Sequence, residues 1–219
     1  MSRLLSLAAA LAVLTGLAAC DAVSPDASAT ASSTAPPTAP PPDGGPSTGT
    51  PPPTGGGPPL DGDRCRGTVG AITVEEIVVP DGARCTLAGT RVQGNVQVGR
   101  GARLVASGAR VGGNVQADAS ADVRVAGGSV GGNVQLSQGG GGLVQDVGID
   151  GDLQVEQNTR AFTLDRNRVR GNLQANQNTG GLSITGNRVA QNLQCQGNQP
   201  APTGGGNTAG DKEDQCAAL

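Results

Sequence analysis

The residues in this 219-residue chain that could carry out chemistry are its carboxylates, its hydroxyls and its cysteines. Histidine, the commonest general base in enzymes, is absent, so serine and threonine lack their usual activating partner. Carboxylates acting in pairs, as in glycoside hydrolysis, are the remaining catalytic arrangement. The candidate pairs are Asp118 with Asp122, Asp150 with Asp152, and Glu156 with Asp165.

None of these pairs recurs in a sequence context that would form a concave site, and no long loop could build the walls of a cleft around them. The glycines at positions 139–142 are predicted to form a flexible corner, and no helix follows them to make a phosphate-binding loop. The Gly-Gly-x-Gly-x-Asp pattern of calcium-binding repeats does not recur either. We therefore expect no catalytic residue and no cofactor, and we predict that the chain is not an enzyme.

The elements that must position these residues follow from a repeat. A tetrapeptide Gly-Asn-Val-Gln begins at positions 94, 113 and 132 and continues in variant form at 151, 171 and 191, so the spacing is 19, 19, 19, 20 and 20 residues. A fixed period of about twenty residues is typical of stacked solenoids. The 37 glycines agree with this interpretation, because every coil needs several tight corners.

Apolar and polar residues alternate within each repeat, as they do in strands with one buried face. Superposed repeats give five inward-facing columns. They are Val96, Val115, Val134, Leu153, Leu173 and Leu193; Val98, Ala117, Leu136, Val155, Ala175 and Cys195; Leu104, Val123, Gly142, Phe162 and Leu182; Ala106, Val125, Val144, Leu164 and Ile184; and Val92, Val111, Val130, Ile149, Val169 and Val189. Phe162 lies next to Gly142 in its column, so the missing side chain is expected to make room for the large one.

Three short strands per coil predict an all-β fold: a single-domain, triangular parallel β-solenoid with 19–20 residues per coil. The register extends upstream to Ile77 and Val79, which gives six to seven coils and a rod of roughly 30–35 Å at ~4.8 Å per coil. Right-handed winding follows from the usual crossover preference.

Polar residues form columns as regular as the apolar ones. Stacked amides can hydrogen-bond along such a rod, and we expect these ladders to hold the corners and satisfy backbone groups rather than to bind a ligand. The ladders are Gln97, Gln116, Gln135, Gln154, Gln174 and Gln194; Asn95, Asn114, Asn133, Asp152, Asn172 and Asn192; Asn158, Asn178 and Asn198; and Asn167, Asn187 and Asn207.

Four of the five cysteines are spaced by about one coil, as Cys65 with Cys85 and Cys195 with Cys216. Residues one coil apart lie ~4.8 Å from each other, within the Cα separation that a disulfide accepts. We therefore predict these two disulfides, each closing a terminal coil. No Cys-x-x-Cys spacing and no histidine accompany them, so no metal site is expected.

One basic column stands out, formed by Arg91, Arg110, Arg168 and Arg188 with Ser129 and Gly148 between the two pairs. Arg166 and Arg170 lie near the second pair. A polyanion, such as a wall polymer or a lipid head group, could bridge adjacent arginines. The simpler interpretation, which the sequence favours, is that these arginines spread into solvent.

Two N-terminal segments differ from the repeats. Residues 4–17 form an apolar run of the length of a secretory signal, and it ends in Leu17-Ala18-Ala19-Cys20, which resembles the lipobox of bacterial lipoproteins. The resemblance implies a signal peptide at 1–19 and a lipid on Cys20. Residues 21–63 hold twelve of the fifteen prolines, which predicts a disordered tether with polyproline II bias between the lipidated cysteine and the solenoid, so that the domains are 1–19, 20–63 and 64–219.

The repeats themselves resemble uncharacterised exported bacterial repeat proteins. The stretches that carry the resemblance are Ile77-Val78-Val79-Pro80-Asp81-Gly82, the Gly-Asn-Val-Gln coils up to Gly171-Asn172-Leu173-Gln174, and the ending Asn192-Leu193-Gln194-Cys195 followed by Asp211-Lys212-Glu213-Asp214-Gln215-Cys216. The architecture is more distantly similar to the bactofilins, which are polymer-forming cytoskeletal proteins with a triangular right-handed β-helix. That similarity implies a fold, and it keeps self-assembly as an alternative.

These observations lead us to expect a membrane-anchored structural, adhesive or binding module that is held outside the cytoplasm and displays flat Gln and Asn faces. The alternatives are a scaffold that assembles by end-to-end stacking, and binding of a cell-envelope polyanion through the arginine column. Charged residues 211–214 and the two disulfides favour a monomer. Nucleic acid is not an expected partner, because Trp and Tyr are absent and Phe162 is the single aromatic residue.

Overall fold

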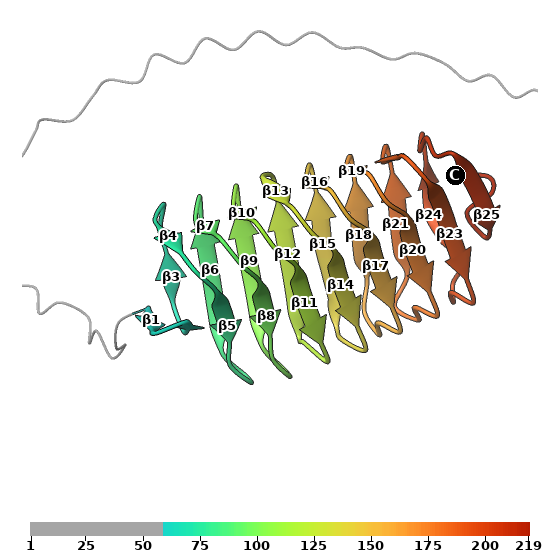
Figure 1. Cartoon of the computed structure of the whole chain (residues 1–219). Coiled ribbons are helices and arrows are strands. Elements are labelled where there is room, and N and C mark those ends of the chain that lie inside the picture. The colour runs from blue at the N-terminus through green and yellow to red at the C-terminus, as the bar shows by residue number, and fades with distance from the viewer. Residues whose placement is uncertain (1–58) are drawn as a thin grey trace, which may run out of the picture. The chain divides into compact units, whose positions relative to one another are not determined.

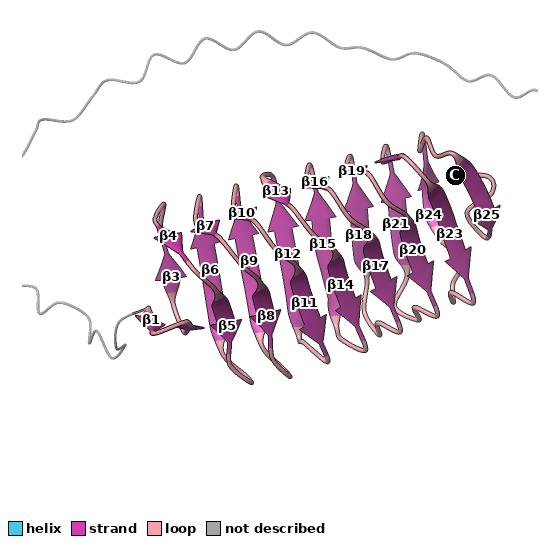
Figure 2. Cartoon of the chain, in the orientation of Figure 1, coloured by secondary structure: helices cyan, strands magenta, loops and turns pink. Residues whose placement is uncertain are grey.

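The computed structural model describes residues 59–219, which form short strands stacked into three sheets (Figure 1). Strands and loops make up this part of the chain, and it contains no helix (Figure 2). No helix that could cross a membrane is therefore found between residues 59 and 219. The predicted signal peptide, Cys20 and most of the predicted tether lie outside the described residues.

We name the three sheets A, B and C in the order in which each coil visits them. Sheet A holds ten strands: β1 (Leu60–Asp61), β2 (Arg64–Cys65), β5 (Ile77–Val79), β8 (Val96–Val98), β11 (Val115–Asp118), β14 (Val134–Ser137), β17 (Leu153–Glu156), β20 (Leu173–Asn176), β23 (Asn192–Gln196) and β25 (Asp211–Asp214). All of its pairings are parallel except that of β1 with β2, which is antiparallel.

Sheets B and C are wholly parallel. Sheet B holds β3 (Thr68–Val69), β6 (Arg84–Ala88), β9 (Arg103–Ser107), β12 (Asp122–Ala126), β15 (Gly141–Gln145), β18 (Phe162–Asp165), β21 (Leu182–Thr185) and β24 (Thr203–Gly205). Sheet C holds β4 (Thr73–Val74), β7 (Arg91–Val92), β10 (Arg110–Val111), β13 (Ser129–Val130), β16 (Gly148–Ile149), β19 (Arg168–Val169) and β22 (Arg188–Val189). The predicted parallel β-solenoid with three strands per coil is confirmed.

The solenoid is longer than the repeat alone indicated, with about eight turns instead of six to seven. Upstream, β3 and β4 complete a coil that lacks the tetrapeptide, and β1 pairs with β2 before the predicted start at residue 64. Downstream, β24 and β25 add strands to sheets B and A. The repeat did not predict these terminal coils, because a strand can pair with a strand of the neighbouring repeat without carrying the tetrapeptide itself.

The core is a narrow stack of the predicted apolar columns. Leu153, Leu173 and Leu193 are fully buried, and their neighbours in the five columns are buried as well, apart from Gly142. Gly142 pairs with Phe162 in the ladder between β15 and β18. A Cβ at position 142 would lie 2.8 Å from Cζ of Phe162, so the glycine does make room for the aromatic ring.

The glycines at positions 139–142 do not form the flexible corner that the sequence predicted. Gly141 and Gly142 belong to β15, and only the two glycines before them lie in the turn. Gly139 is buried, and its N–H donates to Oδ1 of Asn158, 3.0 Å away. This corner is therefore held by the asparagine of the next coil.

Candidate functional site

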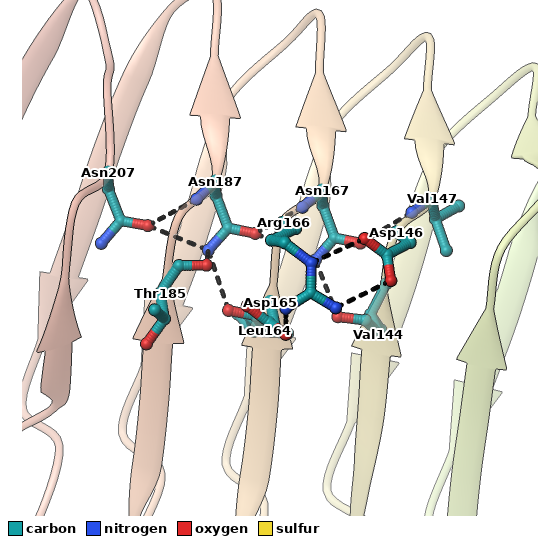
Figure 3. A network of polar contacts seen from close by, with 10 residues as sticks. All are labelled: Val144, Asp146, Val147, Leu164, Asp165, Arg166, Asn167, Thr185, Asn187 and Asn207. Atoms are coloured by element: carbon teal, nitrogen blue, oxygen red, sulfur yellow. Dashed lines mark hydrogen bonds and ion pairs between the residues drawn. The ribbon is translucent and has the colours of Figure 1, made fainter.

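The corners of the solenoid are built by amides that bond to the backbone of the adjacent coil. At the corner between sheets B and C, the N–H of Asn167 donates to Oδ1 of Asn187, and the N–H of Asn187 donates to Oδ1 of Asn207, both at 2.9 Å (Figure 3). Nδ2 of Asn187 donates to the carbonyl of Leu164, 2.8 Å away. These asparagines are buried and fully bonded, as expected for a structural ladder.

The corner between sheets A and B repeats this arrangement with Asn158, Asn178 and Asn198. Its last member is capped from outside the repeat, because the N–H of Asn198 donates to Oε1 of Gln215 at 2.9 Å. These two ladders point into the solenoid and hold its corners, as predicted, so they are not part of an exposed face. A buried backbone N–H at a corner needs an acceptor, and the asparagine side chain turns inward to supply it.

At the third corner, the hydrogen bonds between coils run in the opposite direction along the solenoid. There the backbone N–H of each coil donates to the Oδ1 of the preceding coil, from Asn114 to Asn95 at 2.8 Å and from Asn172 to Asp152 at 2.7 Å. These side chains are partly exposed for most of the column. Because Asp152 is occupied in this way, it is not a free carboxylate.

The glutamine row forms the outer face of sheet A. Gln116 donates to Gln135, Gln135 to Gln154 and Gln154 to Gln174, with side-chain N–O distances of 3.1–3.2 Å. A depression of about 480 Å³ lies at the N-terminal end of this face, lined among others by Pro80, Gly99 and Asp118. No arginine or lysine occurs on strands β8 to β23 of sheet A, so this face is neutral to acidic.

The candidate carboxylate pairs are not brought together. Asp118 ends β11 of sheet A, whereas Asp122 begins β12 of sheet B. Glu156 and Asp165 are likewise divided between sheets A and B. Asp150 is bound by Arg170 at 3.2 Å, so none of the three pairs offers two free carboxylates facing each other.

The two predicted disulfides are present in the structure. The Cα atoms of Cys65 and Cys85 are 5.5 Å apart, and those of Cys195 and Cys216 are 5.2 Å apart. All four residues are buried. No group of three or more potential metal ligands occurs among residues 59–219.

The arginine column lies on sheet C in the predicted register. Arg110 pairs with Arg91 in the ladder of β7 and β10, and Arg168 pairs with Arg188 in that of β19 and β22. All four side chains are exposed, and none has a carboxylate within 4.0 Å in the described part of the chain. Like charges directly opposite each other in a sheet are mildly destabilising, by a few tenths of a kcal/mol.

Arg166 and Arg170, which lie near the second pair, are neutralised. Arg166 contacts Asp146 through two hydrogen bonds of 2.9 Å and Asp165 through an ion pair of 2.6 Å. The hydrogen bond from Arg166 lowers the pKa of Asp146 from its ordinary value of 3.8 and raises the pKa of Arg166. The repeat did not predict this pair, although Asp146 and Arg166 lie one coil apart and interrupt a column of glycines.

The face of sheet C is hollowed beside the arginines. One depression of about 450 Å³ is lined by Arg91, Gln93, Arg110, Gly112, Ser129, Gly131 and Asp150 together with two core valines. Two further depressions, of about 320 and 190 Å³, contact Arg168, and the smaller one also contacts Arg188. The four arginines therefore border a series of hollows along one face.

Comparison of the chain with protein-family models, with curated proteins and with solved structures yields no match.

Proposed function

We propose that this protein is a membrane-anchored, non-enzymatic module that holds a rigid β-solenoid outside the cytoplasm. A lipid on Cys20 anchors the chain, the Pro-rich segment spaces the solenoid from the membrane, and the faces of the solenoid contact cell-envelope components.

The observation that carries this proposal is the position of the two disulfides, one in each terminal region of the solenoid. Disulfides persist in oxidising compartments, which supports export. The ends of a repeat array are its least supported parts, so these bonds suit a rod that must last without chaperones. The apolar run that ends at Cys20 supports a lipid anchor on the same side of the membrane.

A rigid display role is also supported by the continuous ladders. Buried Asn and mostly half-buried Gln columns bond successive coils, and no buried side-chain polar atom lacks a partner in residues 59–219. Such a surface is regular and offers no cleft with paired catalytic groups. A hydrolytic activity abolished by changing one aspartate would contradict the non-enzymatic role.

The anchor is tested by expressing the chain in a bacterium with Cys20 or with Cys20→Ala. We expect palmitate incorporation and membrane retention of the first protein and neither property in the second. Cys195→Ala combined with Cys216→Ala is the control, since it removes cysteines without touching the proposed lipid site. Equal membrane retention with and without Cys20 would contradict the proposed anchor.

Self-assembly is the second candidate function. Ile72, which is 52% exposed, lies in the N-terminal coil and offers an apolar contact. The C-terminal end opposes stacking, because Lys212 of β25 pairs with Leu193 of β23 and its Nζ donates to the carbonyl of Leu219 at 2.9 Å. Sedimentation velocity separates the two cases: a compact monomer supports display, and filaments support a scaffold.

A further inference from the structure

We propose that the face of sheet C binds a linear polymer with phosphate groups in its backbone, running parallel to the solenoid axis. The binding surface, which we name the arginine track, consists of Arg91, Arg110, Arg168 and Arg188 and of the hollows between them. This inference requires only the solenoid, so it stands or falls independently of the lipid anchor.

Charge is distributed unequally between sheets A and C. The strands of sheet C contain four arginines and no carboxylate, whereas the strands of sheet A from β8 to β23 contain carboxylates and no cation. The solenoid as a whole is close to neutral, so the track is a local feature and not the consequence of a basic chain. The carboxylates that line its hollows, Asp146 and Asp150, are each paired with an arginine outside the track. The unpaired charges of the track are therefore positive, and they attract a ligand of the opposite sign.

Within residues 59–219, the four track arginines have no carboxylate partner, whereas arginines close to them in the sequence do. Arg166 and Arg170, on either side of Arg168 in the sequence, are both held by aspartates. The track arginines have no such partner in the described residues, although each lies next to another arginine. Paired guanidinium groups can donate to the oxygens of one phosphate from two directions.

The face of sheet C is hollowed beside the arginines. Gly112 and Gly131 form part of the hollow beside Arg91 and Arg110. A Cβ at Gly112 would collide with the carbonyl of Gln93, and one at Gly131 would collide with the carbonyl of Gly112. The two glycines are thus required by the close packing of adjacent coils, and they leave this part of the hollow without side chains.

The dimensions favour a polymer over a single ion. Arg91 and Arg188 are five coils apart, or ~24 Å, and the inner arginines Arg110 and Arg168 are three coils apart, or ~14 Å. Ser129 and Gly148 fill the centre of the column without charge. A ligand must therefore carry several anionic groups over this length to contact both arginine pairs.

Phosphate in the polymer backbone fits this face better than a charged sugar chain or a base-bearing strand. Sugar rings and bases are usually held by aromatic side chains, and the single aromatic residue, Phe162, is 3% exposed in the core. The large exposed apolar residues of the described chain are Ile72 and Val105, and neither lies on a strand of sheet C. Ile72, whose carbonyl accepts the N–H of Arg91 at 2.8 Å, lies at one end of the track, so the track offers a lipid surface a single exposed apolar side chain.

The experiment measures retention of the purified full-length protein on immobilised long-chain polyphosphate at increasing salt. For four phosphate contacts, affinity should fall about 50-fold between 50 and 200 mM salt, and for two contacts about 7-fold. The test variant is Arg168→Gln with Arg188→Gln, which should show the weaker salt dependence and elute earlier. Tripolyphosphate, which is too short to reach both pairs, should compete far less well than the polymer at equal phosphate concentration.

The matched control is Arg84→Gln with Arg103→Gln on sheet B. These arginines are also exposed and lie opposite each other in a ladder, so the control removes the same charge from the same arrangement. The control should bind polyphosphate like the unchanged protein. Equal weakening by both variants would mean that net charge governs binding, and this result would overturn the proposal.

Two further outcomes decide against the track as described. Tighter binding to a soluble polyuronate than to polyphosphate would overturn the choice of phosphate. Flotation with vesicles of phosphatidylcholine, with and without phosphatidylglycerol, tests binding to a lipid surface. The proposed lipid anchor contributes equally to the flotation of both variants, so a difference between them reports on the arginines. A difference between the variants on anionic vesicles with none on polyphosphate would assign the face to the membrane and overturn the proposal.

Discussion

The Asp146 carboxylate accepts two hydrogen bonds from the Arg166 side chain one coil away, both at 2.9 Å (Figure 3). Both residues have positive φ, 54° and 51°, at the corner between sheets B and C. The equivalent corner residues of other coils are glycines: Gly89, Gly108, Gly127 and Gly186. A residue with a side chain is strained in this conformation. The ion pair between Asp146 and Arg166 offsets part of that strain.

The Asp146–Arg166 pair should make stability depend on pH at its acid end. The pKa of Asp146 is lowered in the folded state, so its contribution is present above 3.8 and is lost as the pH falls through the folded value. Asp146→Asn keeps the shape and tolerates positive φ. Urea unfolding should show the variant less stable at pH 7 and equal at strongly acidic pH, and 1 M salt should shrink the difference. An unchanged difference at acidic pH would contradict this role.

The space beside Phe162 predicts a sharp contrast between two glycines. Gly142→Ala should destabilise the solenoid by about 1–3 kcal/mol, because the new Cβ meets Cζ of Phe162 and the carbonyl of Val123. Gly148→Ala is the control, since the nearest atom to its Cβ is 4.0 Å away. Thermal unfolding of both variants checks this, and equal effects would mean that general strand propensity dominates.

The buried and exposed amide ladders should differ in energetic weight. Asn187→Ala leaves the buried N–H of Asn167 without its acceptor, which should cost about 1–3 kcal/mol. Gln154→Ala removes a ladder member on the outer face of sheet A and should cost less than about 0.5 kcal/mol. Chemical denaturation measures both values, and a larger loss for Gln154→Ala would contradict the assigned roles.

Asn187→Asp offers a test of burial at the same position. The carboxylate keeps an acceptor but loses the donor to Leu164, and burial raises the pKa of an aspartate. Its charged form is disfavoured in the folded state, so the variant should be less stable at pH 7 than at pH near 4. Unfolding at the two pH values should show this reversal relative to the unchanged protein, and pH-independent loss would indicate an open site.

The C-terminal disulfide should stabilise the last coil locally. Cys195→Ala with Cys216→Ala removes a closure of 21 residues, which is worth about 3 kcal/mol. Hydrogen exchange should speed up in β24 and β25 while β11 and β14 stay protected. If this variant forms new oligomers in sedimentation velocity, the disulfide-closed last coil also prevents solenoids from stacking end to end through their apolar cores. Uniform loss of protection along the rod would contradict a local role.

The sequence predicted the inward columns residue by residue. A strand alternates its side chains with a period of two, and a repeat of 19 or 20 residues returns each position to the same place in the next coil. Val134, Leu153 and Leu173 therefore had one possible direction once the repeat was recognised. The same logic placed the cysteines one coil apart and gave the register of the arginines.

The side-chain directions of corner residues could not be predicted in this way, because turns have no alternation rule and these directions depend on φ at neighbouring positions. The sequence therefore determined the stack, its register, its core and its disulfides. The tertiary structure decided that Asn167 and Asn187 turn inward, that Arg166 binds Asp146 while Arg168 stays free, and that Gln215 and Lys212 cover the last coil. The physical reason is that strand periodicity is a local property of the chain, whereas hydrogen-bond partners at corners and ends are chosen by what adjacent coils bring within reach.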